Sequence, residues 1–287
     1  MISYAQNYED LILNRIFKDQ PKGVYVDVGA NEPIKDNVTY HFYLKGWIGL
    51  NFEPNQAYFK KLQEIRPNDI SFNFGCSDKE EVLEFKEILD TGLSTFSNEF
   101  DSIINSLDFK IIKHQIKCVP IKNIFKEQKI TTIDFMSVDV EGFEFNVLKG
   151  NDWDKYRPKV IVLEGVAPTR QDIITYTSFQ SFLENVDYKL RYFDGLNVFF
   201  TDNKNINIPN SCFYPPNCFD DFRQYSTIKD IEKIKDENKK DIEKINDENK
   251  FYSANKLNPS IIDKLIKLRT KDIIYIFFKR LLKKFKK

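Results

Sequence analysis

The chain has 287 residues, enough to bury one sizeable hydrophobic core and to carry an additional segment. Its 43 lysine and arginine residues balance its 43 aspartate and glutamate residues, so the overall charge gives no indication of a nucleic-acid partner, and we expect none. The four cysteines form no CxxC pair and no common zinc pattern, and the start of the chain shows no signal peptide, so we expect reduced thiols and a cytoplasmic location.

Residues 1 to about 200 alternate between helix-like and strand-like patterns. Apolar residues recur at helical spacing over residues 4–17, and Ser3 can cap this first helix. Short β-rich runs, typical of buried parallel strands, follow at residues 23–29, 47–54, 70–78, 133–142 and 159–165. Helical patterns over residues 55–67 and 143–153 lie between them. This order predicts an α/β fold with a mostly parallel sheet.

Residues 188–200 contain two further strand-like runs, separated by Asp194 and Gly195. An Asp-Gly pair between such runs is typical of a tight β-hairpin. We therefore expect the parallel sheet to finish with an antiparallel hairpin.

After residue 200 the composition changes. An Asn- and Pro-rich stretch, which we expect to be irregular, leads into an 11-residue repeat, DIEKIKDENKK followed by DIEKINDENKF, over residues 230–251. A period of 11 corresponds to about 3.67 residues per turn, which predicts a helix with a narrow isoleucine face. That helix is either a solvated single helix or the contact of a homo-oligomer.

The last residues, 271–287, carry seven positive charges and one negative charge. Their apolar side chains cluster on one side of a helical wheel, opposite the lysine and arginine residues. This basic amphipathic pattern suits an anionic membrane surface, and the alternative is a helix that packs on the protein itself. Because no run reaches the roughly 18 consecutive apolar residues of a membrane span, we expect at most peripheral binding to the inner membrane face.

The stretch GVYVDVGANEP, residues 23–33, runs from an apolar strand into a glycine turn. Open α/β folds bind ligands at such carboxyl ends of strands. A dinucleotide site of the G-x-G-x-x-G type would need glycines that this turn lacks after Gly29, where Asn31 and Pro33 follow. Asp27 would repel a pyrophosphate, but it could pair with the ammonium group of S-adenosylmethionine. The turn therefore favours S-adenosylmethionine, and an NAD-dependent oxidoreductase is the alternative.

Two further strand ends carry polar residues that suit this cofactor. Glu53 ends the second strand and is followed by Pro54, so its carboxylate can accept both ribose hydroxyls. Ser77 and Asp78 end the third strand and could bond the adenine edge, although Ser-Asp is also an ordinary loop sequence.

Seven segments, taken in order, resemble the FkbM family of S-adenosylmethionine-dependent methyltransferases: AQNYEDLIL, YVDVGANEP, GWIGLNFEP, LST, VDVEGFEFNVLKG, RPKVIVLEG and DGLNVFF. The resemblance implies a seven-stranded class I methyltransferase fold, which we assign to residues 1–226, followed by the helical repeat at 227–252 and the basic tail at 253–287. It also implies O-methylation, often of sugars in bacterial surface-polysaccharide or antibiotic pathways, and of these we expect surface-polysaccharide synthesis, of capsule or lipopolysaccharide. The acceptor would then be a sugar, a nucleotide sugar or a glycan.

Candidates for the chemistry follow the fourth and fifth strands, where SVDVEGFE supplies Asp139 and Glu141 and IVLEG supplies Glu164. Asp139 and Glu141 point to opposite sides of a strand unless the chain turns, which Gly142 permits. We expect Asp139 to face the cofactor and Glu141 the acceptor; the alternative is that one of them caps the next helix. The three carboxylates could also bind a divalent cation, but no metal-specific spacing is present, so a metal is left open.

The two histidines are weaker candidates. His41 lies within an apolar helical pattern and is interpreted as structural. His114 could be a general base with a pKa suited to neutral pH, but a surface position is the favoured interpretation. A non-catalytic, membrane-tethered scaffold is the last alternative, and the acidic residues at four successive strand ends argue against it.

Overall fold

The computed structural model describes residues 1–106, 109–204, 206–233, 236, 239–240 and 243. The chain divides into two units, Met1–Ser226 and Thr227–Lys287, and each is described by itself. In the second unit the described residues 227–233 are helical. Most of the predicted 11-residue repeat and the whole basic tail lie outside the described residues. Within the described part of the chain, no helix is both long enough and apolar enough to cross a membrane.

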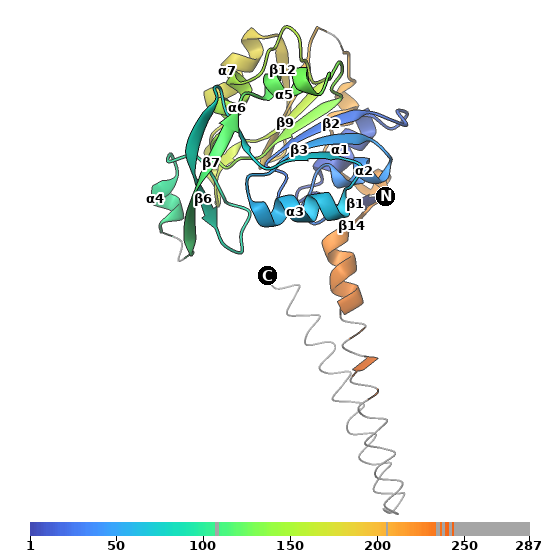
Figure 1. The fold of residues 1–287 in the computed structure, drawn as a ribbon. Coiled ribbons are helices and arrows are strands. Elements are labelled where there is room, and N and C mark those ends of the chain that lie inside the picture. The colour runs from blue at the N-terminus through green and yellow to red at the C-terminus, as the bar shows by residue number, and fades with distance from the viewer. Residues whose placement is uncertain (107–108, 205, 234–235, 237–238, 241–242, 244–287) are drawn as a thin grey trace, which may run out of the picture. The chain divides into compact units, whose positions relative to one another are not determined.

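A seven-stranded sheet forms the centre of the first unit, in the order β12-β13-β9-β8-β2-β3-β4 (Figure 1). Its strands are β2 (Val24–Val28), β3 (Ile48–Phe52), β4 (Ile70–Phe72), β8 (Phe135–Val138), β9 (Val160–Glu164), β12 (Tyr188–Phe193) and β13 (Asn197–Asp202). The five strands from β9 to β4 are parallel, and the β12–β13 hairpin joins β9 in antiparallel register. The predicted mostly parallel α/β sheet with a terminal hairpin is confirmed.

Helices cover both faces of this sheet (Figure 1). Side chains alternate along each strand, so that Val26 and Val28 join one hydrophobic cluster and Tyr25 joins the other. The first cluster includes residues of α5 (Ile121–Glu127), α6 (Glu144–Lys149) and α7 (Thr177–Asn185), and the second includes residues of α1 (Glu9–Ile16) and α2 (Tyr40–Leu44). A further helix, α3 (Gln56–Ile65), connects β3 to β4 and begins where the Asn55 side chain accepts the Ala57 N–H. The candidate active site lies at the carboxyl ends of the parallel strands.

A second sheet, with the order β5-β7-β6, was not anticipated from the sequence. It consists of β5 (Gly75–Cys76), β6 (Glu81–Ile88) and β7 (Ile111–Val119), with the short helix α4 (Asp101–Ile104) between β6 and β7. β6 and β7 are antiparallel along their whole length. Pairing between segments so far apart in sequence leaves little local signal in either one.

The predicted third strand at 70–78 is therefore wrong in its second half. β4 ends at Phe72, and the Asn73 side chain then donates to the backbone oxygens of Glu53 and Pro54, at 2.8 and 3.0 Å. The chain leaves the central sheet there and pairs as β5 with β7.

The predicted capping of the first helix by Ser3 is also wrong. Ser3 ends β1 (Ile2–Ser3), which pairs with β14 (Arg223–Gln224), and α1 begins only at Glu9. The Ser3 hydroxyl donates instead to the Asp10 carboxylate, at 2.6 Å.

Short elements complete the unit: β10 (Val166–Ala167), β11 (Arg170–Ile174) and the 3₁₀ turns Asn210–Phe213 and Cys218–Asp220. All four cysteines are free, in line with the predicted reduced thiols.

Candidate active site

A narrow pocket and a wider cavity meet at the carboxyl ends of the parallel strands. The space between protein atoms, with open solvent included, is about 550 Å³ at the pocket and about 2290 Å³ at the cavity. Residues that line both are Gly29, Asn31, Tyr58, Thr91, Gly92 and Asp139. The two spaces are thus adjacent, and their junction lies at the predicted turn after β2 and at Asp139.

The narrow pocket is mainly apolar. Its aromatic lining comes from Tyr58, Phe52, Phe74, Phe85 and Phe96. Glu53, directly after β3, contributes a carboxylate to the same wall. An apolar pocket with few polar groups at its edge is the usual form of a site for a small organic ligand.

The Glu53 side chain is buried but held by two backbone amides. Oε2 accepts the N–H of Asn31 and Oε1 accepts the N–H of Asn55, both at 2.7 Å. Burial raises the pKa of Glu53 to about 7, and the two amides oppose that rise. Each carboxylate oxygen keeps lone-pair capacity for a ligand hydroxyl, because a carboxylate has about four acceptor positions.

The turn after β2 requires glycine at residue 29. Gly29 has φ +84°, and a Cβ there would lie 1.9 Å from the backbone oxygen of Asp139. Asn31 also has a positive φ, +49°, and its buried Oδ1 has no hydrogen-bond partner. A buried acceptor of this kind at the cavity junction fits a ligand that donates hydrogen bonds.

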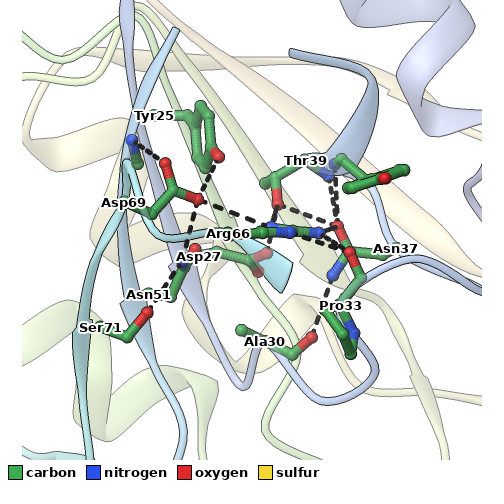
Figure 2. Close-up of polar contacts among 12 residues, drawn as sticks. Tyr25, Asp27, Ala30, Pro33, Asn37, Thr39, Asn51, Arg66, Asp69 and Ser71 are labelled. Carbon is green, nitrogen blue, oxygen red and sulfur yellow. Dashed lines mark hydrogen bonds and ion pairs between the residues drawn. The ribbon is translucent and has the colours of Figure 1, made fainter. Parts of the chain in front are cut away.

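Asp27, near the end of β2, lines the wider cavity and is part of a polar network (Figure 2). Its Oδ2 accepts the Thr39 hydroxyl at 2.6 Å. Burial raises the pKa of Asp27, and the nearby positive charge of Arg66 opposes that rise. The carboxylate is therefore fixed on one side by Thr39.

Arg66, which follows α3, is fully buried and organises this network (Figure 2). Its guanidinium donates to the Pro33 backbone oxygen, to Thr39 Oγ1 at 2.8 Å and to Asn37 Oδ1 at 2.5 Å. Asp69 Oδ2 lies 3.9 Å from Nη1. Arg66 was not predicted as a site residue from the sequence, because an arginine at the end of an amphipathic helix is usually exposed.

Three predicted catalytic carboxylates converge on the wider cavity. One oxygen from each of Asp139, Glu141 and Glu164 lies within 4.8 Å of the others. Asp139 follows β8 and Glu164 ends β9, whereas Glu141 reaches the cavity because the chain turns at φ +53°, with Gly142 next at φ +91°. The turn that the sequence analysis allowed at Gly142 therefore brings Asp139 and Glu141 to the same cavity.

Neighbouring groups hold the turn at 140–142. The Thr95 hydroxyl donates to the backbone oxygen of Glu141 at 2.8 Å. Glu144 accepts the amides of Val140 and Gly142, at 3.2 and 3.1 Å. Glu144 thus accepts the free backbone amides just before α6. The sequence had suggested Asp139 or Glu141 as the residue that caps this helix.

The pKa values of the cluster are raised. Burial is the main cause for Glu141 and Glu164, followed by the charges of the neighbouring carboxylates. Asp139 is exposed to the cavity. The surrounding protein nevertheless reduces its solvation, and this effect together with the charge of Asp27 raises its pKa to about 6. Raised pKa values of carboxyl groups that share a cleft are typical of functional sites.

Other predicted residues lie away from the two spaces. Ser77 and Asp78 are not among the lining residues; the Ser77 hydroxyl donates to Glu81 at 2.9 Å, and Gly75 and Cys76 line the pocket in their place. His41 lies in α2, 3.2 Å from Asn14, and burial lowers its pKa to about 4. His114 is exposed on β7 and lies 2.7 Å from Glu87. The interpretations of His41 as packed and of His114 as a surface residue agree with these positions.

Glu9 is a cavity carboxylate that the sequence analysis missed. It is the first residue of α1 and lines the wider cavity. Its Oε2 accepts the Asn7 N–H at 2.9 Å, and Asn197 donates to Oε1. Burial raises the pKa of Glu9 to about 8.

The family model described as "Methyltransferase FkbM domain" matches residues 27–192, more than half of the chain. The chain belongs to this FkbM methyltransferase family. The matched FkbM region contains the turn after β2, Glu53 and the three carboxylates of the wider cavity. No curated protein matches the sequence.

Solved structures similar to this FkbM chain include the methyltransferase FkbM from Methylobacillus flagellatus, with 14% identity, 63% of this chain and 44% of that chain covered, and a TM-score of 0.41. A TehB-like SAM-dependent methyltransferase from Corynebacterium glutamicum has 11% identity, coverage of 67% and 87%, and a TM-score of 0.37. A precorrin-6y C5,15-methyltransferase from Geobacter metallireducens has 12% identity, coverage of 68% and 87%, and a TM-score of 0.35. The chain thus spans less than half the length of the Methylobacillus protein.

Proposed function

We propose that this FkbM chain transfers a methyl group from S-adenosylmethionine to a sugar hydroxyl, in the synthesis of a bacterial surface polysaccharide. The observation that carries the proposal is the junction at Asp139, where an apolar pocket bearing one buried carboxylate opens into a cavity lined by further carboxylates. Family membership favours methyl transfer over the NAD-dependent oxidoreductase and the non-catalytic scaffold.

The residues of the narrow pocket fit the adenosine part of the cofactor. Aromatic rings such as Phe52 and Phe74 suit a purine base, and Glu53 suits the two ribose hydroxyls. Asp27, which lines the wider cavity beyond the turn, suits the ammonium group of the methionine part. Gly29 lets the turn after β2 lie directly against the backbone of Asp139, where the two spaces meet.

The wider cavity would hold the acceptor. When bound, S-adenosylmethionine supplies a methyl group that leaves sulfur as it joins the acceptor oxygen, so the hydroxyl proton must go to a base. Asp139 lies at the junction and Glu141 lies beside it, so either carboxylate can take that proton. Carboxylates accept hydrogen bonds only, which suits an acceptor rich in hydroxyl groups: a sugar, a nucleotide sugar or a glycan.

The cofactor assignment is tested by calorimetry with S-adenosylhomocysteine. We expect Asp27→Ala and Glu53→Ala each to weaken binding by about 1.5–3 kcal/mol, the range for hydrogen bonds to charged groups. Glu84→Ala is the control, because Glu84 is exposed on β6, pairs with Lys113 at 2.9 Å and lines neither space. Wild-type affinity in both site variants would overturn the assignment.

The basic tail at 253–287 belongs to the proposal as a peripheral anchor. Each lysine or arginine near an anionic surface contributes roughly 1 kcal/mol, so the seven at 271–287 could hold a cytoplasmic enzyme reversibly on the inner membrane face. The repeat at 227–252 would then be a spacer or the contact of a homo-oligomer, beyond a methyltransferase domain at 1–226.

Sedimentation with vesicles tests the anchor. We expect the full chain to sediment with phosphatidylserine-containing vesicles at low salt, and a chain truncated after Asn255 to stay in solution while keeping its affinity for S-adenosylhomocysteine. Equal behaviour of the two chains would leave the tail without a membrane role.

A further inference from the structure

The cluster formed by Asp139, Glu141 and Glu164 has no positive partner in the described structure. None of the three takes part in an ion pair between described residues. The basic residues that line the same cavity, Lys35 and Arg170, are exposed and pair with Asp36 and Asp172. Three neighbouring carboxylates therefore lack a compensating charge.

Glu141 gives an independent indication of a ligand. The residue is only 6% exposed, and its Oε2 has no hydrogen-bond partner among the described residues. Thr95 and Glu144 hold the backbone of residues 140–142, which fixes the position from which the Glu141 side chain extends. A buried carboxylate oxygen without a donor is rare in folded proteins and calls for an occupant.

A shared proton satisfies the cluster only in part. One proton between Glu141 and Glu164 would neutralise that pair, but it would leave the remaining oxygens and Asp139 without a cation or a donor. A divalent cation can bind all three. Opposite ligands of one ion, each at 2.0–2.6 Å, lie roughly 4–5 Å apart, which agrees with the 4.8 Å limit within the cluster.

We propose that Asp139, Glu141 and Glu164 form a binding site for a divalent cation of the oxygen-preferring class, such as Mg²⁺, Mn²⁺ or Ca²⁺. The site opens into the wider cavity, beside the junction with the narrow pocket. Its role, which rests on the proposed function, is to bind the acceptor hydroxyl and lower the pKa of that hydroxyl. Asp139, Glu141 and Glu164 would then be ligands, and the proton of the hydroxyl would pass to water in the cavity.

The experiment uses the full chain and Mn²⁺ alone, followed by electron paramagnetic resonance of the free ion. We expect one ion per chain in the wild type. Glu141→Gln and Glu164→Gln should each weaken binding by at least about tenfold, since even loss of a residue that only orients a ligand costs roughly 10- to 100-fold. Glu84→Gln makes the same chemical change on exposed β6 and should leave binding unchanged. Asp139→Asn is a second test should a buried variant fold poorly.

Affinity for S-adenosylhomocysteine is measured in parallel on the same variants. Loss of Mn²⁺ binding with cofactor affinity retained supports the site separately from the methyltransferase assignment. Absence of Mn²⁺ binding by the wild type at millimolar concentration overturns the cation site, even where the cofactor binds normally. Equal Mn²⁺ affinity in wild type, Glu141→Gln and Glu164→Gln also overturns it, because the ion would then lie elsewhere.

Discussion

Asp139→Asn and Glu141→Gln are each expected to lower the turnover number by about 100-fold or more, the low end for a group that takes part in general acid–base catalysis. Both substitutions preserve the shape of the side chain and remove its negative charge. The loss is expected whether the carboxylate accepts the hydroxyl proton directly or binds a cation that activates the hydroxyl. Release of S-adenosylhomocysteine, measured with the neutral sugar or nucleotide sugar that the wild type methylates fastest, gives the rate.

Two further measurements separate this effect from misfolding. Affinity for S-adenosylhomocysteine should change little in Glu141→Gln, because Glu141 lines the wider cavity and not the narrow pocket that holds Glu53 and the aromatic rings. Glu84→Gln, on the exposed face of β6, should turn over like the wild type. Wild-type turnover in both Asp139→Asn and Glu141→Gln would show that neither carboxylate serves the reaction.

Arg66→Met is expected to destabilise the fold by about 3–5 kcal/mol, the cost of removing one partner from a buried charged group. Arg66 has no exposed surface, and its guanidinium binds the Pro33 backbone oxygen, Asn37 and Thr39 (Figure 2). Without it the Pro33 backbone oxygen and Thr39 Oγ1 lose a donor, and the charges of Asp27 and Asp69 lose a compensating neighbour. Equilibrium unfolding in urea measures the change in the free energy of unfolding.

Arg170→Met is the matched control, because it removes an arginine that is 50% exposed and pairs with exposed Asp172. Exposed pairs of this kind contribute little to stability. Arg66→Met should therefore lower the free energy of unfolding far more than Arg170→Met does. Equal and small effects at both positions would mean that the network of Figure 2 does not hold the segment after β2 in place.

Much of the site could be predicted because its signals are local. A carboxylate directly after an apolar run lies at a strand end, and parallel strands bring their carboxyl ends to one edge. Asp27, Glu53, Asp139 and Glu164 were found in this way, and all line the pocket or the cavity. The β12–β13 hairpin was found from its Asp-Gly pair for the same reason.

The errors arose where a distant segment competes with the local pattern. Residues 70–78 read as one strand, but Asn73 binds the backbone of Glu53 and Pro54, and β7 offers β5 another partner. Because the chain pairs in this way, Ser77 and Asp78 do not line the pocket. Ser3 could not cap α1, because Asp10 accepts its hydroxyl and β14 pairs with its backbone.

The sequence by itself determined the α/β class, the terminal antiparallel hairpin, and the strand ends that carry acidic residues, because hydrophobic periodicity and turn residues act over a few positions. Tertiary structure alone decided which of these side chains meet. Glu141 joins Asp139 and Glu164 only through a positive φ, which Thr95 supports from 46 residues away in sequence and Glu144 from the start of the next helix. Arg66 can be buried because hydrogen-bond acceptors of the segment at 33–39 surround its guanidinium. Such convergence depends on contacts between residues far apart in sequence, for which no local pattern exists.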